Sequence, residues 1–348
     1  MHVLITGGAG FIASHVVNLL GKEYPHYTLV VLDKMGYAAH ADHIQVPATL
    51  IQGDICDKEK VRDVFQRHAI THVMHFAAET HVDNSFLDSL PFSIANMVGT
   101  DVLLRQSKLT PNFQRFLHVS TDEVYGECVS GSFAETDAMA PSNPYSASKA
   151  GAELMVQAYM RSFNFPALIT RANNVYGPHQ YPEKLVPIVV QSIRDGTPVP
   201  LHGGGDQIRQ WVAVEEFAEA LVATGEALAE DHPQVVGGVF NIAGPVRVSV
   251  RDLTESIATS MGVDDPSSVW EAVADRPGQD RAYCVSGDRL ATVLGVRPER
   301  SILDPVEIKQ LVEAYPITGI TVDAADYGSA SSRLRLAATA SLAAPRQP

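Results

Sequence analysis

Short apolar runs alternate with longer amphipathic segments through the first half of the chain. Runs of this length are typical of buried parallel strands, which we expect at residues 2–6, 28–32, 50–55, 72–78, 113–120 and 167–170. Helices are expected between them, at 14–20, 61–68, 91–108 and 145–163. The alternation predicts an α/β fold with a Rossmann-like, doubly wound parallel sheet.

The alternation weakens after Arg171, where proline and glycine become frequent and a smaller C-terminal lobe is expected to begin. We place the first domain at residues 1–172, with part of 206–242 returning to it, and the smaller, substrate-binding lobe at 173–322. From 323 to 348 the chain is rich in Ala and Ser and has few large apolar residues, which predicts a disordered tail.

The first expected strand runs directly into the glycine turn Gly7-x-x-Gly10-x-x-Ala13, which precedes helix-like sequence. Glycine at position 7 allows a tight turn, and glycine at position 10 lets the backbone approach a pyrophosphate. The small Ala13 allows the helix to pack closely on the strand, and the helix N-terminus offers N–H groups to phosphate oxygens. This strand-turn-helix context predicts a dinucleotide site.

The second expected strand ends at Asp33, at the distance from the glycine turn where a carboxylate meets the adenosine ribose. A carboxylate accepts hydrogen bonds from a 2′-hydroxyl and repels a 2′-phosphate, so the sequence predicts NAD rather than NADP as cofactor. A solvated strand end is the alternative interpretation of Asp33 and Lys34.

Other residues at the carboxyl ends of the expected strands complete this cofactor site. Asp54 and Ile55 are expected to flank an adenine, and the small Ala77 and Ala78 to leave space for the cofactor. The predicted cofactor-binding residues are Gly7, Gly10, Phe11, Ile12, Asp33, Lys34, Asp54, Ile55, Phe76, Ala77, Ala78, Tyr145, Lys149 and Asn173.

Composition and charge restrict the remaining possibilities. Hydrophobic residues make up 45% of the 348 residues, and no stretch resembles a membrane span. The first strand leaves no room for a signal peptide, and three scattered cysteines offer neither a disulfide framework nor a metal site, so a cytoplasmic location without a metal is expected. The net charge of −14 disfavours nucleic acid and anionic membranes, and an anionic ligand would need a local cluster of Arg and Lys.

Tyr145 and Lys149 lie four residues apart and therefore share one face of the expected helix. A lysine ammonium beside a phenol stabilises the phenolate and is expected to lower its pKa, so that Tyr145 can take a proton from an alcohol as hydride leaves for a nicotinamide. Thr121, at the end of a neighbouring strand, is expected to bind the same hydroxyl. The alternative interpretation of a Tyr-x-x-x-Lys pattern is a pair of exposed surface residues without a catalytic role.

The adjacent acidic residues Asp122 and Glu123 add a second kind of chemistry. Oxidation of a carbon acidifies the neighbouring C–H group, so Glu123 could remove that proton while Asp122 protonates a departing hydroxyl. The pair predicts elimination of water after oxidation. A solvated acidic turn or a helix N-cap is the alternative, and two adjacent residues need a bent backbone to face one ligand.

These residues give the chain a clear family resemblance. It resembles the extended short-chain dehydrogenase/reductases, and more narrowly the nucleotide-sugar 4,6-dehydratases that act on dTDP-glucose and UDP-glucose. The likeness runs from His2 to about Gly295, and its motifs are Thr6 to Ile12, His75 to Asp83, Ser120 to Gly126, Tyr145 to Lys149, Arg171 to Pro178, Pro182 to Lys184 and Arg276 to Arg281.

The resemblance implies a cycle on tightly bound NAD. Tyr145 takes the proton of the C4 hydroxyl as C4 is oxidised, Glu123 and Asp122 remove water across C5 and C6, and the hydride returns to C6. The implied product is a nucleotide 4-keto-6-deoxyglucose. The implied catalytic residues are Thr121, Asp122, Glu123, Tyr145 and Lys149.

The resemblance also implies that the smaller lobe binds the nucleotide diphosphate of the sugar substrate. Arg209 and Arg276 can grip a diphosphate as bidentate donors, although an ordinary surface ion pair is the alternative for each. The implied substrate-binding residues are Thr121, Asn174, Lys184, Leu185, Leu201, Arg209, Asn241, Arg276 and Gln279. Relatives pair the helices expected at 91–108 and 145–163 across a two-fold axis, so a homodimer built on a four-helix bundle is expected.

Two alternatives on the same scaffold remain, a 4-epimerase and a UDP-glucuronate decarboxylase. The aspartate position is usually serine in the decarboxylases, and the acidic pair is absent from the epimerases, so Asp122 argues against both. A non-catalytic dinucleotide sensor is a third alternative. Gln279 and Asn84 depart from the bacterial dTDP-glucose enzymes, which leaves the choice between thymidine and uridine open.

Overall fold

The computed structural model describes residues 1–276 and 278–315, and its larger part is built on a seven-stranded sheet. All the strand pairs of this sheet are parallel, and their order is β10-β6-β5-β4-β1-β2-β3. The order reverses direction between β1 and β4, which creates the crevice where doubly wound sheets bind ligands. The strands are β1 His2–Thr6, β2 Thr28–Asp33, β3 Thr49–Gln52, β4 His72–His75, β5 Arg115–Thr121, β6 Ala167–Ala172 and β10 Val239–Ile242.

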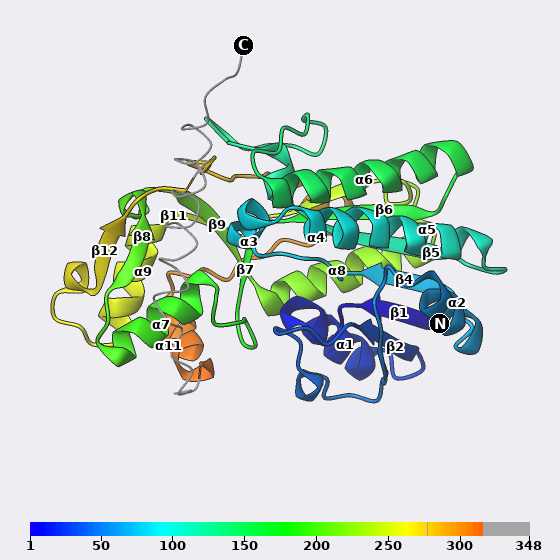
Figure 1. Ribbon diagram of the computed structural model, residues 1–348, viewed down its shortest axis with the longest axis horizontal. Helices are drawn as coiled ribbons and strands as arrows, with labels where there is room; N and C mark the ends of the chain where they lie inside the picture. The colour runs from blue at the N-terminus through cyan, green and yellow to red at the C-terminus, as the bar shows by residue number, and fades with distance from the viewer. Residues whose placement is uncertain (277, 316–348) are drawn as a thin grey trace, which may run out of the picture.

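Helices cover both faces of the sheet (Figure 1). Helices α1 (Phe11–Glu23) and α8 (Val214–Ala229) pack on one face, in a core that contains Val17, Val31 and Phe217. Helices α2 (Lys58–Arg67), α5 (Gly99–Leu109) and α6 (Pro144–Phe163) pack on the other face, in a separate core. The strands are buried on both sides, which explains their continuous apolar sequence.

The helix expected at 91–108 is present but is not regular. It begins as α4 (Leu90–Phe92), widens into a π-helical stretch at Ser93–Val98 and continues as α5. Within the π-helical stretch, Asn96 bonds to the backbone of Glu79 on both sides, through Nδ2 to the carbonyl at 3.1 Å and through Oδ1 to the N–H at 2.8 Å. Such bulges concentrate at functional sites, and this one ties the helix to the segment that follows β4.

The smaller lobe lies beside the carboxyl ends of the sheet strands (Figure 1). It contains a three-stranded sheet of order β11-β9-β7 and a parallel pair of β8 and β12. Its core includes Tyr176, Leu201 and Trp211. Its elements are β7 Asn174–Tyr176, α7 Leu185–Asp195, β8 Val199–His202, β9 Ile208–Ala213, β11 Val246–Ser249, α9 Val250–Ser260, β12 Trp270–Val273 and α11 Pro305–Ala314.

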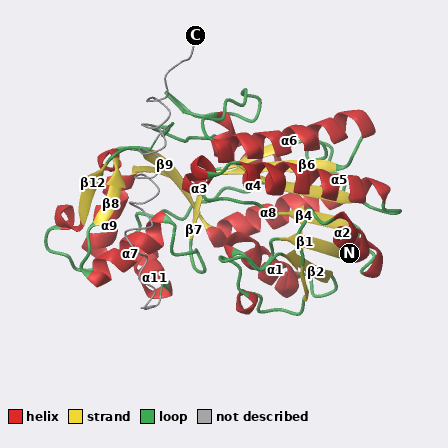
Figure 2. Cartoon of the chain, in the orientation of Figure 1, coloured by secondary structure: helices red, strands yellow, loops and turns green. Residues whose placement is uncertain are grey.

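The expected α/β class is confirmed, and the structure adds details to the expected elements. The strand expected at 50–55 ends at Gln52, because Gly53 and Asp54 turn the chain and Asp54 accepts a hydrogen bond from the N–H of Cys56. Helix α8 and strand β10 were not predicted individually, and both lie with the large sheet and within residues 206–242. Figure 2 shows helices and strands alternating through this part of the molecule.

A buried ion pair connects α6 to the neighbouring strand β6. Arg171 and Glu153 have side chains that are 3% and 0% exposed, and both Nε and Nη2 of Arg171 donate to the Glu153 carboxylate, Nη2 at 2.7 Å. Nη1 of Arg171 donates to the hydroxyl of Tyr125 at 2.6 Å, and the guanidinium lies over that ring. The pair therefore fixes α6, β6 and the turn that follows β5.

No helix within the described residues is long and apolar enough to cross a membrane. The disordered tail expected at 323–348 lies outside the described residues.

Candidate active site

A cavity of about 550 Å³ lies between the carboxyl ends of the large sheet and the smaller lobe. Residues from the ends of β1, β2, β4, β5 and β6 line one side, and residues of the smaller lobe, including Lys184 and Arg209, line the other. All fourteen residues predicted to bind the cofactor line this cavity.

No group of His, Cys, Asp and Glu within residues 1–276 and 278–315 is arranged to hold a metal ion.

The glycine turn has the geometry that a pyrophosphate requires. Gly7 has φ of +71°, and a Cβ there would lie 2.9 Å from the backbone of Ala77, so only glycine fits. Helix α1 begins after Gly10 without a side-chain cap and without an acidic residue in its first turn. Its free N–H groups and the positive end of its dipole therefore favour an anion in the cavity.

Asp33 stabilises the glycine turn and also lines the cavity. Its Oδ2 accepts a hydrogen bond from the N–H of Ala9 at 3.1 Å, and its Oδ1 accepts one from Met35 at 2.8 Å. Each carboxylate oxygen keeps a further lone pair for a ribose hydroxyl. The neighbouring Lys34 is ion-paired with Glu79, so its charge is partly compensated.

Helix α6 brings Tyr145 and Lys149 into the cavity wall. A capping box at Asn143 and Ser146 starts the helix, with Pro144 at its first position. Nζ of Lys149 donates to the carbonyl oxygen of Val119 at 2.8 Å. Burial lowers the pKa of Lys149 to about 8, against the opposing effect of the Glu153 carboxylate.

The expected lowering of the Tyr145 pKa by Lys149 is wrong for this structure. Burial raises the pKa of the Tyr145 phenol, the charge of Glu123 raises it further, and a hydrogen bond with Thr121 only partly opposes them. The lysine ammonium is directed to the Val119 carbonyl, and the groups that face the phenol are carboxyls. A phenolate at Tyr145 therefore needs a positive charge from outside these side chains.

The acidic pair lies on a 3₁₀ turn, Asp122–Tyr125, which bends the backbone directly after β5. This bend lets the two adjacent carboxyls take different surroundings. Glu123 lines the cavity and accepts a hydrogen bond from Nδ2 of Asn143 at 3.2 Å, and burial raises its pKa.

Asp122 lies behind the cavity surface instead. It is 2% exposed and is not one of the lining residues, and its Oδ2 accepts a hydrogen bond at 2.7 Å from Asn173, which does line the cavity. Burial raises the pKa of Asp122 to about 7, although the bond from Asn173 opposes the rise. Its carboxyl therefore keeps a proton near neutral pH, as a general acid must.

The structure brings most of the predicted substrate-binding residues to the cavity. Those that line it are Thr121, Asn174, Lys184, Leu185, Arg209, Arg276 and Gln279. Leu201 and Asn241 are corrections. Leu201 is 1% exposed and packs in the core of the smaller lobe. Asn241 is fully buried and bonds to Tyr125 and to the carbonyl of Phe133, so its polar atoms are used inside the protein.

The two predicted arginines are held differently. Arg209 is 8% exposed, donates to the backbone carbonyls of Ile208 and Asp280, and lies 4.4 Å over the ring of Tyr283. Arg276 reaches out of the smaller lobe and forms an ion pair with Asp83. Both cations thus face the cavity with part of their hydrogen-bonding capacity already used.

Several lining residues were not predicted. Asn143 holds Glu123, and its place before Pro144 at a helix start was the sequence signal that could have revealed it. Tyr37 and Tyr181 contact each other edge to face at 5.0 Å, and Trp211 also lines the cavity. No local sequence pattern marks these aromatic residues, because tertiary packing alone brings them together.

Comparisons with known proteins agree with this site. The family model of GDP-mannose 4,6 dehydratase matches residues 4–308. A dTDP-glucose 4,6-dehydratase of Actinoplanes is 39% identical over 317 residues, covering 88% of this chain and 95% of the relative. A trifunctional UDP-glucose 4,6-dehydratase, epimerase and reductase of Arabidopsis thaliana is 42% identical over 297 residues, 83% of this chain, which spans only 44% of that relative's length.

Solved structures give the same fold with different activities. The dTDP-glucose 4,6-dehydratase DesIV of Streptomyces venezuelae, with NAD bound, superposes with a TM-score of 0.82 at 36% identity, covering 90% of this chain and 97% of that one. A UDP-glucose 4-epimerase of Thermotoga maritima also has a TM-score of 0.82, at 27% identity, with 90% and 98% covered. The fold alone therefore does not distinguish the two activities.

The raised pKa of Asp122 predicts a pH-dependent stability. In the unfolded chain the carboxyl titrates near 3.8, so folding binds a proton between about pH 4 and 7, and stability is lost as pH rises through this window. Asp122→Asn removes the titrating group. Its free energy of unfolding should rise relative to wild type by roughly 1 to 4 kcal/mol between about pH 4 and 7, and then level off. Urea denaturation at a series of pH values measures the difference, and a difference that does not change with pH would contradict it.

Proposed function

The chain belongs to the GDP-mannose 4,6-dehydratase family of nucleotide-sugar enzymes, and we propose that it converts a nucleotide-diphosphate glucose into the 4-keto-6-deoxy sugar. The substrate we propose is dTDP-glucose or UDP-glucose, on which relatives about 40% identical are named to act. The observation that carries the proposal is the acidic turn, which sets the buried Asp122, whose pKa burial raises to about 7, next to Glu123 beside Tyr145.

NAD is the cofactor that the cavity fits. The glycine turn at Gly7 and the uncapped start of α1 suit a pyrophosphate. The Asp33 carboxylate suits a ribose without a 2′-phosphate. Oxidised NAD, when bound, supplies a hydride acceptor and a positive charge that lowers the pKa of a nearby phenol.

Tyr145 and Thr121 act on the hydroxyl at C4 of the sugar. Thr121 orients the hydroxyl, and Tyr145 takes its proton as C4 becomes a ketone. Lys149, whose pKa burial lowers to about 8, lies one helical turn from Tyr145 in the same wall of the cavity, with its ammonium bonded to the Val119 carbonyl.

Glu123 and Asp122 then remove water across C5 and C6. The ketone at C4 acidifies C5–H, and Glu123, which lines the cavity, takes that proton. Asp122 gives its proton to the departing 6-hydroxyl. Because Asp122 lies behind the cavity surface, bonded to Asn173, this step requires the 6-hydroxyl to reach the wall beside Asn173, which does line the cavity. The hydride removed from C4 then returns to C6, and Glu123 returns a proton to C5, so C4 stays a ketone and the sugar loses one water without net oxidation.

We propose that the smaller lobe, which comes mainly from residues 173–322, binds the nucleotide diphosphate. Residues 1–172, together with the part of 206–242 that returns to the large sheet, hold NAD. Lys184, Arg209 and Arg276 line the cavity on the lobe side and supply positive charge that the acidic chain as a whole lacks. Asn174, which also lines it, adds a neutral amide for hydrogen bonds. Three free cysteines within the described residues are consistent with a reducing, cytoplasmic setting, which we also propose.

The proposed activity is tested by incubating the purified protein with UDP-glucose and dTDP-glucose separately. Dehydration should produce a 4-keto-6-deoxy sugar, detected by its absorbance in alkali and by a mass lower by one water. A product of unchanged mass would indicate a 4-epimerase. Absence of any product from either sugar, while a related dehydratase is active in the same assay, would contradict the proposal.

The two chemical steps should separate in variants of the site. Asp122→Asn should still oxidise C4 but lose water about 10²- to 10⁴-fold more slowly, so that a nucleotide ketoglucose with its 6-hydroxyl accumulates. Glu123→Gln should stall at the same point and also lose exchange of C5–H with solvent deuterium. Tyr145→Phe should give no ketone at all. Mass spectrometry of the quenched reaction identifies each species, and dehydration by Asp122→Asn at the normal rate would remove Asp122 from its role.

We also propose a homodimer through the helices that cover one face of the sheet. Leu90, Ile94 and Val98 follow one another at four-residue spacing and are 63%, 44% and 47% exposed, and Leu154 on α6 is 55% exposed. Such an apolar surface on two adjacent helices suits a four-helix bundle between two copies.

The proposed dimer predicts the mass of the protein in solution. Light scattering at micromolar concentration should give twice the chain mass, because dimerisation buries the exposed apolar side chains. The double change Ile94→Glu and Leu154→Glu should give a monomer, since it places like charges in the proposed interface. A monomeric wild type would contradict the dimer.

A further inference from the structure

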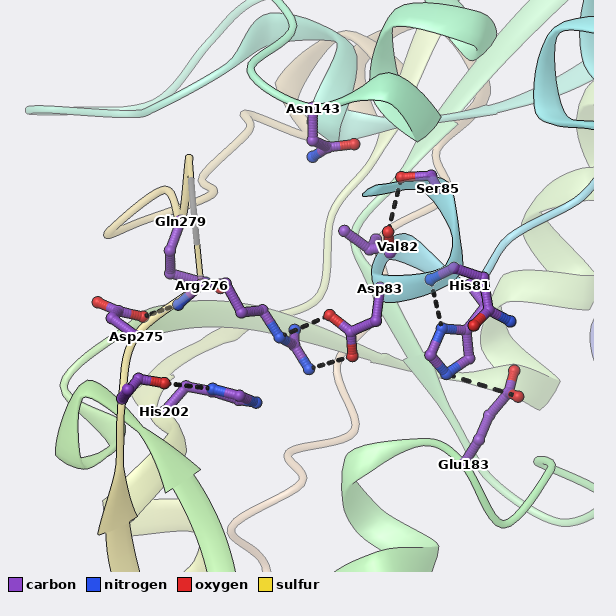
Figure 3. Close-up of polar contacts among 12 residues, drawn as sticks. His81, Val82, Asp83, Ser85, Asn143, Glu183, His202, Asp275, Arg276 and Gln279 are labelled. Carbon is purple, nitrogen blue, oxygen red and sulfur yellow. Dashed lines mark hydrogen bonds and ion pairs between the residues drawn. The ribbon is translucent and has the colours of Figure 1, made fainter. Parts of the chain in front are cut away.

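A short turn of the large domain, residues 80–83, is held between two segments of the smaller lobe, and each segment carries a cation that lines the cavity. On one side, Nζ of Lys184 donates to the carbonyl oxygen of Thr80 at 3.3 Å. On the other side, Arg276 reaches Asp83 from the chain that follows β12 (Figure 3). The turn therefore links the large domain to two segments of the smaller lobe beside the proposed diphosphate site.

Two nitrogens of Arg276 contact the two carboxylate oxygens of Asp83. Nη2 donates to Oδ2 at 2.9 Å, and Nε lies 2.8 Å from Oδ1 without hydrogen-bond alignment. Nη1 has no hydrogen-bond partner among the residues that the structure describes, and Arg276 lines the cavity while Asp83 does not. The guanidinium thus keeps one edge against Asp83 and a nitrogen available for a ligand.

Asp83 is itself well anchored. It lies in the first turn of α3 (Val82–Leu87), where a carboxylate is favoured by the helix dipole. His81 caps this helix by accepting the N–H of Asn84, and its Nε2 lies 3.7 Å from Glu183, which precedes Lys184 (Figure 3). Burial lowers the pKa of His81. The backbone that carries Asp83 is therefore held in place, and its short side chain can orient the longer side chain of Arg276.

From this geometry we infer that Asp83 is a positioning residue for the substrate: it holds Arg276 in the orientation in which its free nitrogen meets the diphosphate. The inference rests on the proposed function only in taking a nucleoside diphosphate as the ligand. It assigns a role to a residue of the large domain that does not line the cavity.

Two opposing effects decide whether removal of Asp83 weakens or strengthens diphosphate binding. An unpaired carboxylate near a diphosphate repels it, but the charge of Asp83 is already compensated by Arg276 at 2.9 Å. A free arginine, in contrast, has many rotamers, and ordering it on a ligand costs conformational entropy. Arg276 is 28% exposed and has solvent on one side, so without Asp83 it would leave the cavity wall for part of the time. Removal of Asp83 should therefore weaken binding.

The test is calorimetric titration of UDP and of thymidine diphosphate into the full-length protein. Asp83→Ala should raise the Kd of the tighter-binding diphosphate about tenfold, and Asp83→Asn, which keeps one oxygen acceptor, about threefold. In the Arg276→Gln background, Asp83→Ala should change the Kd less than about twofold, because Asp83 acts through Arg276. In turnover of the sugar substrate, KM should rise with the Kd while kcat changes less than about twofold.

Asp63→Ala is the matched control, because Asp63 forms an exposed ion pair with Arg67 on α2, outside the cavity wall. Its Kd should equal that of wild type. An unchanged or lower Kd in Asp83→Ala, or an equal loss in the Arg276→Gln background, would overturn the inference. The binding measurement needs no turnover. If the wild type binds a diphosphate but forms no keto sugar, the proposed function fails and the role of Asp83 is still decided. If the wild type binds neither diphosphate, both the proposed function and the role of Asp83 are contradicted.

Discussion

The buried ion pair between Arg171 and Glu153 is the interaction on which the arrangement of the active site depends. Glu153 lies one helical turn beyond Lys149 on α6, and Arg171 lies on β6 two residues before Asn173. Because the same guanidinium also bonds to Tyr125, the end of the acidic turn is fixed to the helix that carries Tyr145. A buried pair of this kind contributes little net stability, but either charge alone would be costly to bury, so the three elements keep one relative position.

In the proposed function, the acidic turn rather than the fold determines which reaction occurs. A dehydratase and an epimerase superpose on this chain with the same TM-score of 0.82, so the sheet and its cavity suit several reactions of nucleotide sugars. The turn after β5 gives two adjacent carboxyls different surroundings. Glu123 faces the cavity, and Asp122 is buried against Asn173 with a pKa near 7. Backbone curvature over four residues thus gives two similar side chains the different surroundings that the proposed base and acid require.

The sequence predicted what depends on local geometry. The glycine turn, the strand ends at Asp33 and Ala77, and the pairing of Tyr145 with Lys149 on one helix follow from residue type and spacing, and all line the cavity. Errors arose where long-range packing decides. Leu201 and Asn241 are inside the protein because β8 packs against β12 and because Tyr125 takes up the Asn241 amide. The pKa of Tyr145 was misjudged because its sign is set by burial and by Glu123, which spacing along a helix does not reveal.

The chain passes between its two parts repeatedly. It leaves the large sheet after β6, returns for α8 and β10, leaves again for β11, α9 and β12, and comes back once more as α10 (Asp288–Leu294), which packs on α8 and β10. Neither part is a continuous segment of sequence. A hybrid enzyme that takes its nucleotide specificity from one relative and its cofactor site from another cannot be made by a single cut and join. Such an exchange needs several segments of the chain to be replaced together, or individual substitutions in the cavity wall.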